Sequence, residues 1–204
     1  IISDMDAPDK NATGTSNAIP VEDIFALAEK LTPDVKTYGF IYNTSEDNAV
    51  STVEAAKAYL DEKGLSYEEA VITNSSEIQQ AAQNLFPKVD AVFIPNSAMV
   101  QSGMALVGQV TREFKKPTYA CSAATVEAGA MATVAMSDKE IGAKTADMII
   151  EYLEGKAVKD IPAVVFPASN EVLNEDLIKD IGITFPDGAT DNATFVKETT
   201  GDDK

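Results

Sequence analysis

The chain has 204 residues, 45% of them hydrophobic, which is enough to bury one sizeable core, or a large core and part of a second. Its 33 acidic and 16 basic residues give a net charge of -17, which opposes binding to nucleic-acid phosphates and to anionic membranes. There is no histidine, and the single cysteine, Cys121, allows neither an internal disulfide nor a cysteine-based zinc site. We therefore expect no metal, no cofactor and no nucleic-acid partner.

The N-terminal segment, residues 1–17, is polar and rich in turn-forming residues, so it predicts a connection. Residues 1–6 resemble the end of an element already under way, and we expect that an N-terminal part precedes them. No apolar stretch has the length needed to span a membrane. The first predicted helix has an apolar stripe at Ile24, Leu27 and Leu31 and ends before Pro33.

Three units of strand, polar loop and helix occupy the stretch from residue 36 to about 115. Runs rich in aromatic and branched residues predict strands at 37–42, 67–72 and 91–94. Each strand ends in a loop of small hydroxyl and amide residues, and apolar residues at helical spacing follow each loop. Shorter runs predict further strands at 118–120, 131–134 and 163–166.

Alternating strands and helices predict an α/β fold, a doubly wound parallel sheet of about five strands with helices on both faces. With the common strand order 2-1-3-4-5, the switch point lies between the first and third strands. It places residues 43–48 and 95–97 on either side of one crevice. The loops at 73–76 and 121–124 flank that crevice.

The C-terminal third is predicted to contain two helices and a polar tail. Ser137 and Glu140 form a capping-box pattern, in which each side chain satisfies a free amide of the other. The buried face of this helix is predicted at Ile141, Thr145, Met148, Ile149 and Tyr152. A helical segment is expected around 173–181, and the tail from 187 to 204 has few large apolar residues, so we expect it to be loosely ordered.

Ligand-binding candidates are the small polar residues that follow the strands, because neutral donors, neutral acceptors and helix N-termini suit a carboxylate. They are Asn43, Thr44, Ser45, Asn48, Ser75, Ser76, Asn96, Ser97, Cys121 and Ser122. The competing interpretation for each is helix capping, and Ser76 with Gln79 fits a capping box. Recurrence of such loops at one sheet edge favours a polar pocket.

Catalysis has little support in the sequence. Cys121 could be a nucleophile, but no histidine exists to activate it, and a small residue in the pocket wall is the simpler interpretation. No glycine-rich phosphate loop or metal-binding loop follows any strand. Glu46 and Asp47 most simply favour the positive end of the next helix.

Three stretches carry a family resemblance: YGFIYNTSEDN at 38–48, NSSEIQQAA at 74–82 and VDAVFIPN at 89–96. They resemble the substrate-binding proteins of one ABC transporter family, which includes tryptophan- and tyrosine-binding lipoproteins. The resemblance implies a type I periplasmic-binding-protein fold with two α/β lobes and a small-molecule ligand, an amino acid in some members, in the cleft between them. It also implies a permease partner and an extracytoplasmic location, at the cell surface or in the periplasm, through a lipid anchor outside this chain.

On this resemblance the chain divides into four parts: a remnant of the N-terminal lobe at 1–34, the C-terminal ligand-binding lobe at 35–136, linking elements at 137–186 and the tail at 187–204. Two alternatives stay open, the effector-binding domain of a transcription regulator and a catalytic doubly wound domain.

A single lobe supplies only one wall of such a cleft, so we expect weak ligand binding by residues 1–204 alone. Apolar surface is expected to be exposed on the helix of Ile24, Leu27 and Leu31 and on the strand at 163–166, which would lead to self-association.

Overall fold

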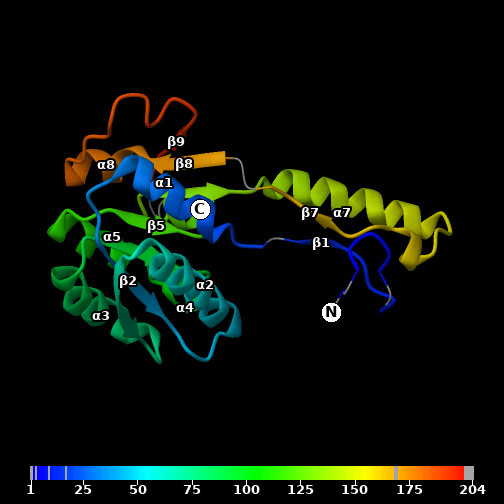
Figure 1. Ribbon diagram of the computed structural model, residues 1–204, viewed down its shortest axis with the longest axis horizontal. Helices are drawn as coiled ribbons and strands as arrows, with labels where there is room; N and C mark the ends of the chain where they lie inside the picture. Colours follow the sequence, from blue (N-terminus) through cyan, green and yellow to red (C-terminus); the bar gives the residue numbers. More distant parts are fainter. Residues whose placement is uncertain (1, 3, 9, 17, 168–169, 200–204) are drawn as a thin grey trace. The chain divides into compact units, whose positions relative to one another are not determined.

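The computed structural model describes residues 2, 4–8, 10–16, 18–167 and 170–199. The chain forms two compact units (Figure 1). The small unit comprises residues 1–18 and 136–169, and the large unit comprises residues 19–135 and 170–204. Within the described ranges no helix is both long and apolar enough to cross a membrane.

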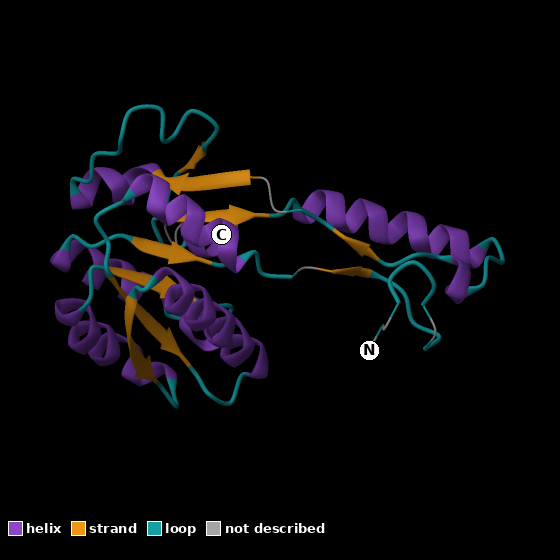
Figure 2. Cartoon of the chain, viewed as in Figure 1, coloured by secondary structure: helices purple, strands orange, loops and turns teal. Residues whose placement is uncertain are grey.

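The large unit is built on a seven-stranded sheet in the order β3-β2-β4-β5-β6-β8-β9. Figure 2 shows the strands in orange and the helices in purple. The first five strands in this order are parallel, β8 runs antiparallel to β6, and β9 runs parallel to β8. This confirms the doubly wound parallel sheet and the predicted order of its first five strands. The strands are β2 (Thr37–Tyr42), β3 (Ser66–Val71), β4 (Ala91–Ile94), β5 (Thr118–Ala120), β6 (Ala132–Ala135), β8 (Asn170–Asn174) and β9 (Thr194–Val196).

Alternation along the central strands separates two apolar layers, as expected for strands buried on both faces. In β2, Phe40 lies with Phe93 in an aromatic group around Phe25, whereas Ile41 lies in the core cluster that includes Leu85. The helices that cover the sheet are α1 (Val21–Leu31), α2 (Asp47–Lys63), α3 (Ile78–Leu85), α4 (Ala98–Ser102), α5 (Met104–Phe114), α6 (Ala123–Glu127) and α8 (Glu175–Ile181), with short 3-10 helices η1 (Ser75–Glu77) and η2 (Phe86–Lys88).

Helix α1 belongs to the large unit, where it contacts α2, β5 and β6. The expectation that Ile24, Leu27 and Leu31 would be exposed is wrong, because their side chains are at most 2% exposed. Phe25 is buried against Tyr38 in an edge-to-face contact with ring centroids 5.0 Å apart. The assignment of residues 1–34 to a lobe of a longer protein stays a prediction.

The C-terminal part of the large unit is more ordered than its composition suggested. Residues 194–196 of the expected loose tail form β9, which pairs with β8. Residues 173 and 174, expected in a helix, end β8, because Asn174 caps α8 by accepting from the Leu177 N–H. Arg112 of α5 contacts Asp180 at 2.7 Å and also pairs with Glu198, which ties the segment after β9 to the helices.

The small unit consists of α7 (Asp138–Leu153), the short helix η3 (Val158–Asp160) and a parallel pair of strands, β1 (Thr15–Ser16) and β7 (Val164–Val165). Ser137 caps α7 by accepting from the Glu140 N–H at 3.3 Å. No return bond from the Glu140 side chain to Ser137 exists in the described part of the chain, so the predicted capping box is only half formed.

The predicted buried face of α7 is only partly correct. Met148 is buried, but Ile149 and Tyr152 are 53% and 57% exposed. Ile150 and Leu153 are exposed as well, so this helix shows apolar side chains on more than one side.

Candidate ligand-binding edge

The candidate residues follow β2, β3, β4 and β5, four parallel strands whose carboxyl ends share one edge of the sheet. Their exposure differs in a way that the sequence did not predict. Thr44, Ser45, Asn48, Ser75 and Ser76 are exposed, Asn96 and Ser122 are half-buried, and Asn43, Ser97 and Cys121 are buried.

Hydrogen bonds join the segment after β2, including the start of α2, directly to the segment after β4. Asn48 Nδ2 donates to the carbonyl of Asn96 at 2.6 Å, and Thr52 Oγ1 donates to Asn96 Oδ1 at 2.9 Å. The Met99 N–H donates to Glu46 Oε1 at 3.1 Å. The two segments predicted to flank the switch point therefore lie side by side, and Asn96 is the residue on which their contacts converge.

Glu46 is a residue of this edge that the sequence analysis explained only by its charge. Its Oε1 accepts from Met99, but its Oε2 is buried without a partner among the described residues. Nearby, Asn43 Nδ2 contacts the Met99 sulfur at 3.6 Å, although sulfur is a weak acceptor. The side-chain oxygen of Asn43, Oδ1, accepts from the backbone N–H and from the hydroxyl of Ser45, both at 2.8 Å. Asn43 therefore shapes its own loop.

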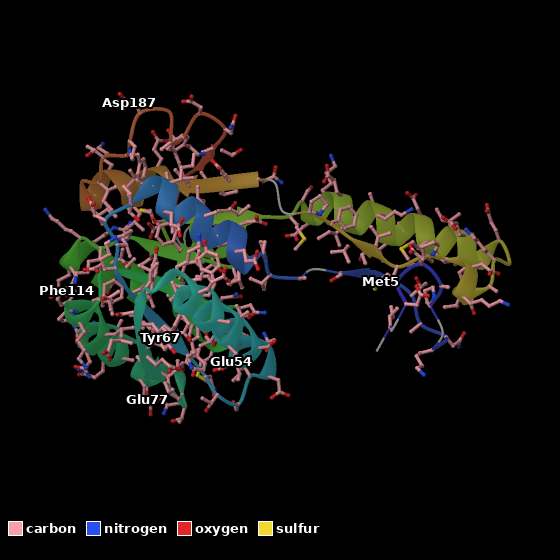
Figure 3. The ribbon with its side chains drawn as sticks, in the orientation of Figure 1. Met5, Glu54, Tyr67, Glu77, Phe114 and Asp187 are labelled. Atoms are coloured by element: carbon pink, nitrogen blue, oxygen red, sulfur yellow. The ribbon has the colours of Figure 1, made fainter. Side chains whose placement is uncertain are left out.

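The loop after β3 is organised by Asn74. Its side chain caps η1 by accepting from the Ser76 N–H at 3.1 Å, so the proposed capping box of Ser76 and Gln79 is wrong. Glu77, labelled in Figure 3, accepts from the Thr73 N–H at 2.8 Å, and this bond lowers the pKa of its carboxyl. Helix α4 contacts η1, which places this loop beside the one after β4.

The loop after β5 carries Cys121 and Ser122. Burial raises the pKa of the Cys121 thiol, although a backbone hydrogen bond from Asn96 acts in the opposite direction. A neutral buried thiol is a poor nucleophile. Ser122 caps α6 through the Thr125 N–H at 3.3 Å. Strands β4 and β5 are paired, with Ile94 opposite Ala120, so this loop lies beside the loop after β4.

Capping accounts for part of the predicted set. Ser97 accepts from the Val100 N–H at 3.3 Å and is fully buried, so its hydroxyl serves α4. Asn48 and Asn96 instead connect loops, and Thr44 and Ser75 make no side-chain hydrogen bond within the described ranges. Polar groups of Thr44, Ser75 and Asn96 are thus available at this edge.

Two alternatives to this edge as a binding site in the large unit are a hollow at the other edge of the sheet and a metal site. A hollow of about 630 Å³ lies at the opposite, amino-terminal edge of the sheet, bordered by Leu31, Asp90 and Phe185. Its volume does not mark the site, because ligands of doubly wound sheets bind at the carboxyl ends of strands. Over the residues that the structure describes, no group of three or more acidic or cysteine side chains could hold a metal ion.

Known proteins resemble the chain over nearly its whole length. It is 32% identical over 197 residues to a tyrosine-binding protein of Clostridioides difficile, covering 97% of this chain and 56% of the relative. A Streptococcus pneumoniae ABC domain solved in complex with L-Trp is 34% identical with a TM-score of 0.84, over 96% of this chain and 66% of that one.

A ligand-free, open structure of a substrate-binding protein with adhesive properties from Clostridium difficile is 32% identical with a TM-score of 0.83, over 97% of this chain and 66% of that one. The chain therefore spans less than two thirds of the length of these relatives. A LacI-family regulator of Enterococcus faecium with bound ribose is 13% identical with a TM-score of 0.58, which shows a shared fold alone. Residues 1–197 match the family model of ABC transporter substrate-binding proteins, and the chain belongs to that family.

Proposed function

We propose that the chain is part of the extracytoplasmic solute-binding component of an ABC importer and that it binds an aromatic amino acid at the carboxyl edge of its parallel strands. The observation that carries the proposal is that the segments after β2, β4 and β5 meet at one edge, where Asn48 and Thr52 both bond to Asn96 at the switch point of the sheet. Relatives that bind tyrosine or are solved with L-Trp support the choice of ligand.

In this proposal the ten candidate residues have different tasks. Thr44, Ser45, Asn48, Ser75, Ser76 and Asn96 offer polar atoms to the ligand. Asn43, Ser97 and Ser122 hold the loops in place, and Cys121 forms part of the wall. No catalytic step is included, because the chain lacks histidine and its one thiol is buried.

Calorimetric titration with L-tyrosine and L-tryptophan tests the function. We expect micromolar or tighter binding by the complete gene product. Residues 1–204 alone should bind much more weakly, because one wall buries too little of the ligand. Failure of the complete gene product to bind either amino acid would contradict the ligand. Micromolar binding by residues 1–204 would instead show that one wall is sufficient.

The proposed location is outside the cytoplasmic membrane, with a lipid anchor in the complete gene product and a permease as the protein partner. The family description supports this arrangement. Protease treatment of intact cells tests it, with envelope barriers permeabilised where they are present. A protein that is degraded only after lysis of the cytoplasmic membrane would contradict the location.

Self-association of residues 1–204 is also proposed, through the exposed apolar side chains of α7. These are Ile149, Ile150, Tyr152 and Leu153. A net charge of -17 opposes association only within about 8 Å at physiological salt, which does little against direct apolar contact. Light scattering should show mass increasing with concentration, and Leu153→Glu should reduce the increase. A monomer at every concentration would contradict this proposal.

A further inference from the structure

The side chain of Asn96 is held by a residue that lies outside every predicted loop. Thr52 is on α2 and only 7% exposed, and its hydroxyl donates to Asn96 Oδ1 at 2.9 Å. The Asn96 backbone is held as well, because its carbonyl accepts from Asn48 Nδ2. The backbone oxygen and the side-chain oxygen of Asn96 are thus both held by residues of α2.

This arrangement determines where the Asn96 amide can donate. An amide group has its oxygen and nitrogen on opposite sides, so a hydrogen bond to Oδ1 from Thr52 directs Nδ2 away from α2. No acceptor for Nδ2 lies within bonding distance in the described part of the chain. Asn96 is half-buried at the candidate edge. The bond from Thr52 therefore orients its two Nδ2–H donors in advance, and neither donor has a partner within the described residues.

We propose that Thr52 is a positioning residue that directs Asn96 Nδ2 at the carboxylate of the bound ligand. The inference rests on the proposed function and makes it more specific, because it assigns the carboxylate to one donor group. The four loops at this edge contain no lysine or arginine. These loops therefore offer only neutral donors to a carboxylate, and a donor that is held in place loses little entropy on binding.

The geometry separates two kinds of ligand. A carboxylate accepts strongly from Nδ2, whereas a neutral carboxamide of the same size accepts more weakly, because hydrogen bonds to charged groups are about twice as strong. Without the Thr52 hydroxyl, Asn96 can turn its oxygen toward the ligand, and that oxygen repels a carboxylate. Discrimination between the two ligands should then fall.

The experiment measures the affinities of L-tyrosine and L-tyrosinamide for the complete gene product and its variants by calorimetry. Thr52→Val keeps the shape of the side chain and removes its hydroxyl. We expect it to weaken L-tyrosine binding by roughly 10-fold and to change L-tyrosinamide binding by much less. Thr52→Ser keeps a hydroxyl and should restore most of the preference.

Asn96→Asp provides a second, independent test. It replaces the donor by a carboxylate of the same shape, so it should weaken L-tyrosine binding strongly and reverse the preference in favour of L-tyrosinamide. Thermal unfolding of each variant shows whether it is folded before its affinity is compared.

Two results would overturn the inference while leaving the function intact. One is an unchanged ratio of the two affinities in both Thr52→Val and Asn96→Asp. The other is an equal loss for both ligands in Thr52→Val and Thr52→Ser, which would show a purely structural role. Wild-type protein that binds neither L-tyrosine nor L-tryptophan would instead contradict the proposed function and, with it, this assignment.

Discussion

Asn48 donates its side-chain amide to the backbone carbonyl of Asn96 at 2.6 Å and thereby joins two loops that are 48 residues apart in the chain. The bond crosses between β2 and β4, where the order of the parallel strands reverses. Asn48 also lies in the first turn of α2, so the helix and the loop after β4 are fixed to each other. The shape of the candidate edge depends on this contact.

Replacing Asn48 by Asp tests that dependence. The carboxylate would face the Asn96 carbonyl, so we expect a loss of about 1 kcal/mol in the free energy of unfolding. A negative charge in the first turn of a helix normally stabilises it by about 0.3–1 kcal/mol, which makes the expected sign diagnostic.

Ser51→Asp is the matched control for Asn48→Asp. It adds the same charge to α2 at an exposed position that makes no hydrogen bond to Asn96 within the described ranges. Urea unfolding of both variants at one salt concentration measures the difference. Equal stabilities would show that the bond between the loops contributes nothing.

Asn174 has a double role that the sequence analysis did not find. It is fully buried, its Oδ1 accepts from the Leu177 N–H at 2.9 Å, and its Nδ2 donates to the Val126 carbonyl at 2.9 Å. Asn174→Ala removes both bonds and should destabilise the chain by about 1–3 kcal/mol. Asn174→Asp keeps the helix cap but turns a buried carboxylate toward a carbonyl, so it should destabilise at least as much.

Asn170→Ala, at the exposed start of the same strand, is the control for both Asn174 variants. It should change the unfolding midpoint little. If Asn174→Asp were as stable as the wild type, the bond to Val126 would not matter and the cap alone would explain the residue.

The strand order could be predicted because most of the parallel strands carry a short apolar run and end in a polar loop, two signals that are local in sequence. In β3, Glu68 and Glu69 interrupt that run. Strand β8 could not be predicted, because Asn170 and Glu171 break its apolar pattern and only pairing with β6 makes it a strand. The exposed side of α7 was misjudged for a related reason. Helical spacing identified an apolar stripe that contains Ile149 and Tyr152. It could not show whether that stripe packs against another element, and both side chains are in fact exposed.

The same distinction applies to the candidate edge. Topology located the switch point and Asn96, since the ends of parallel strands meet at one edge. It could not identify Thr52, whose importance depends on one hydroxyl that reaches a residue 44 positions away. Nor could it identify the cap at Asn74, because Ser76 with Gln79 matched the capping pattern equally well.

Tyr42 provides a test of the electrostatics beside this edge. Burial, together with a hydrogen bond from its hydroxyl to Glu69 Oε2 at 2.6 Å, raises the pKa of Tyr42 from 10.0 to about 12. Because the folded pKa exceeds the unfolded one, the neutral phenol stabilises the fold below pH 10, and this contribution is lost as the pH rises from 10 to 12.

The ultraviolet absorbance of tyrosinate measures this shift of Tyr42. The difference between the wild type and Tyr42→Phe should develop near pH 12, and the stability advantage of the wild type should shrink above pH 10. A difference that develops near pH 10 would show that Glu69 and burial do not hold the phenol neutral.

The reactivity of the Cys121 thiol distinguishes two roles for the loop after β5, which are a wall of the ligand site and a reactive centre. The side chain is 6% exposed, and burial raises the pKa of its thiol, so almost no thiolate forms at neutral pH. We expect the folded chain to react with a disulfide reagent at least about 100-fold more slowly than the chain in urea, where the thiol is exposed. Ser51→Cys in a Cys121→Ala background places a thiol at an exposed position of α2 and should react at once in the folded state. Rapid reaction of native Cys121 would mean that the loop opens or that the thiol is activated, and either result would remove Cys121 from the wall.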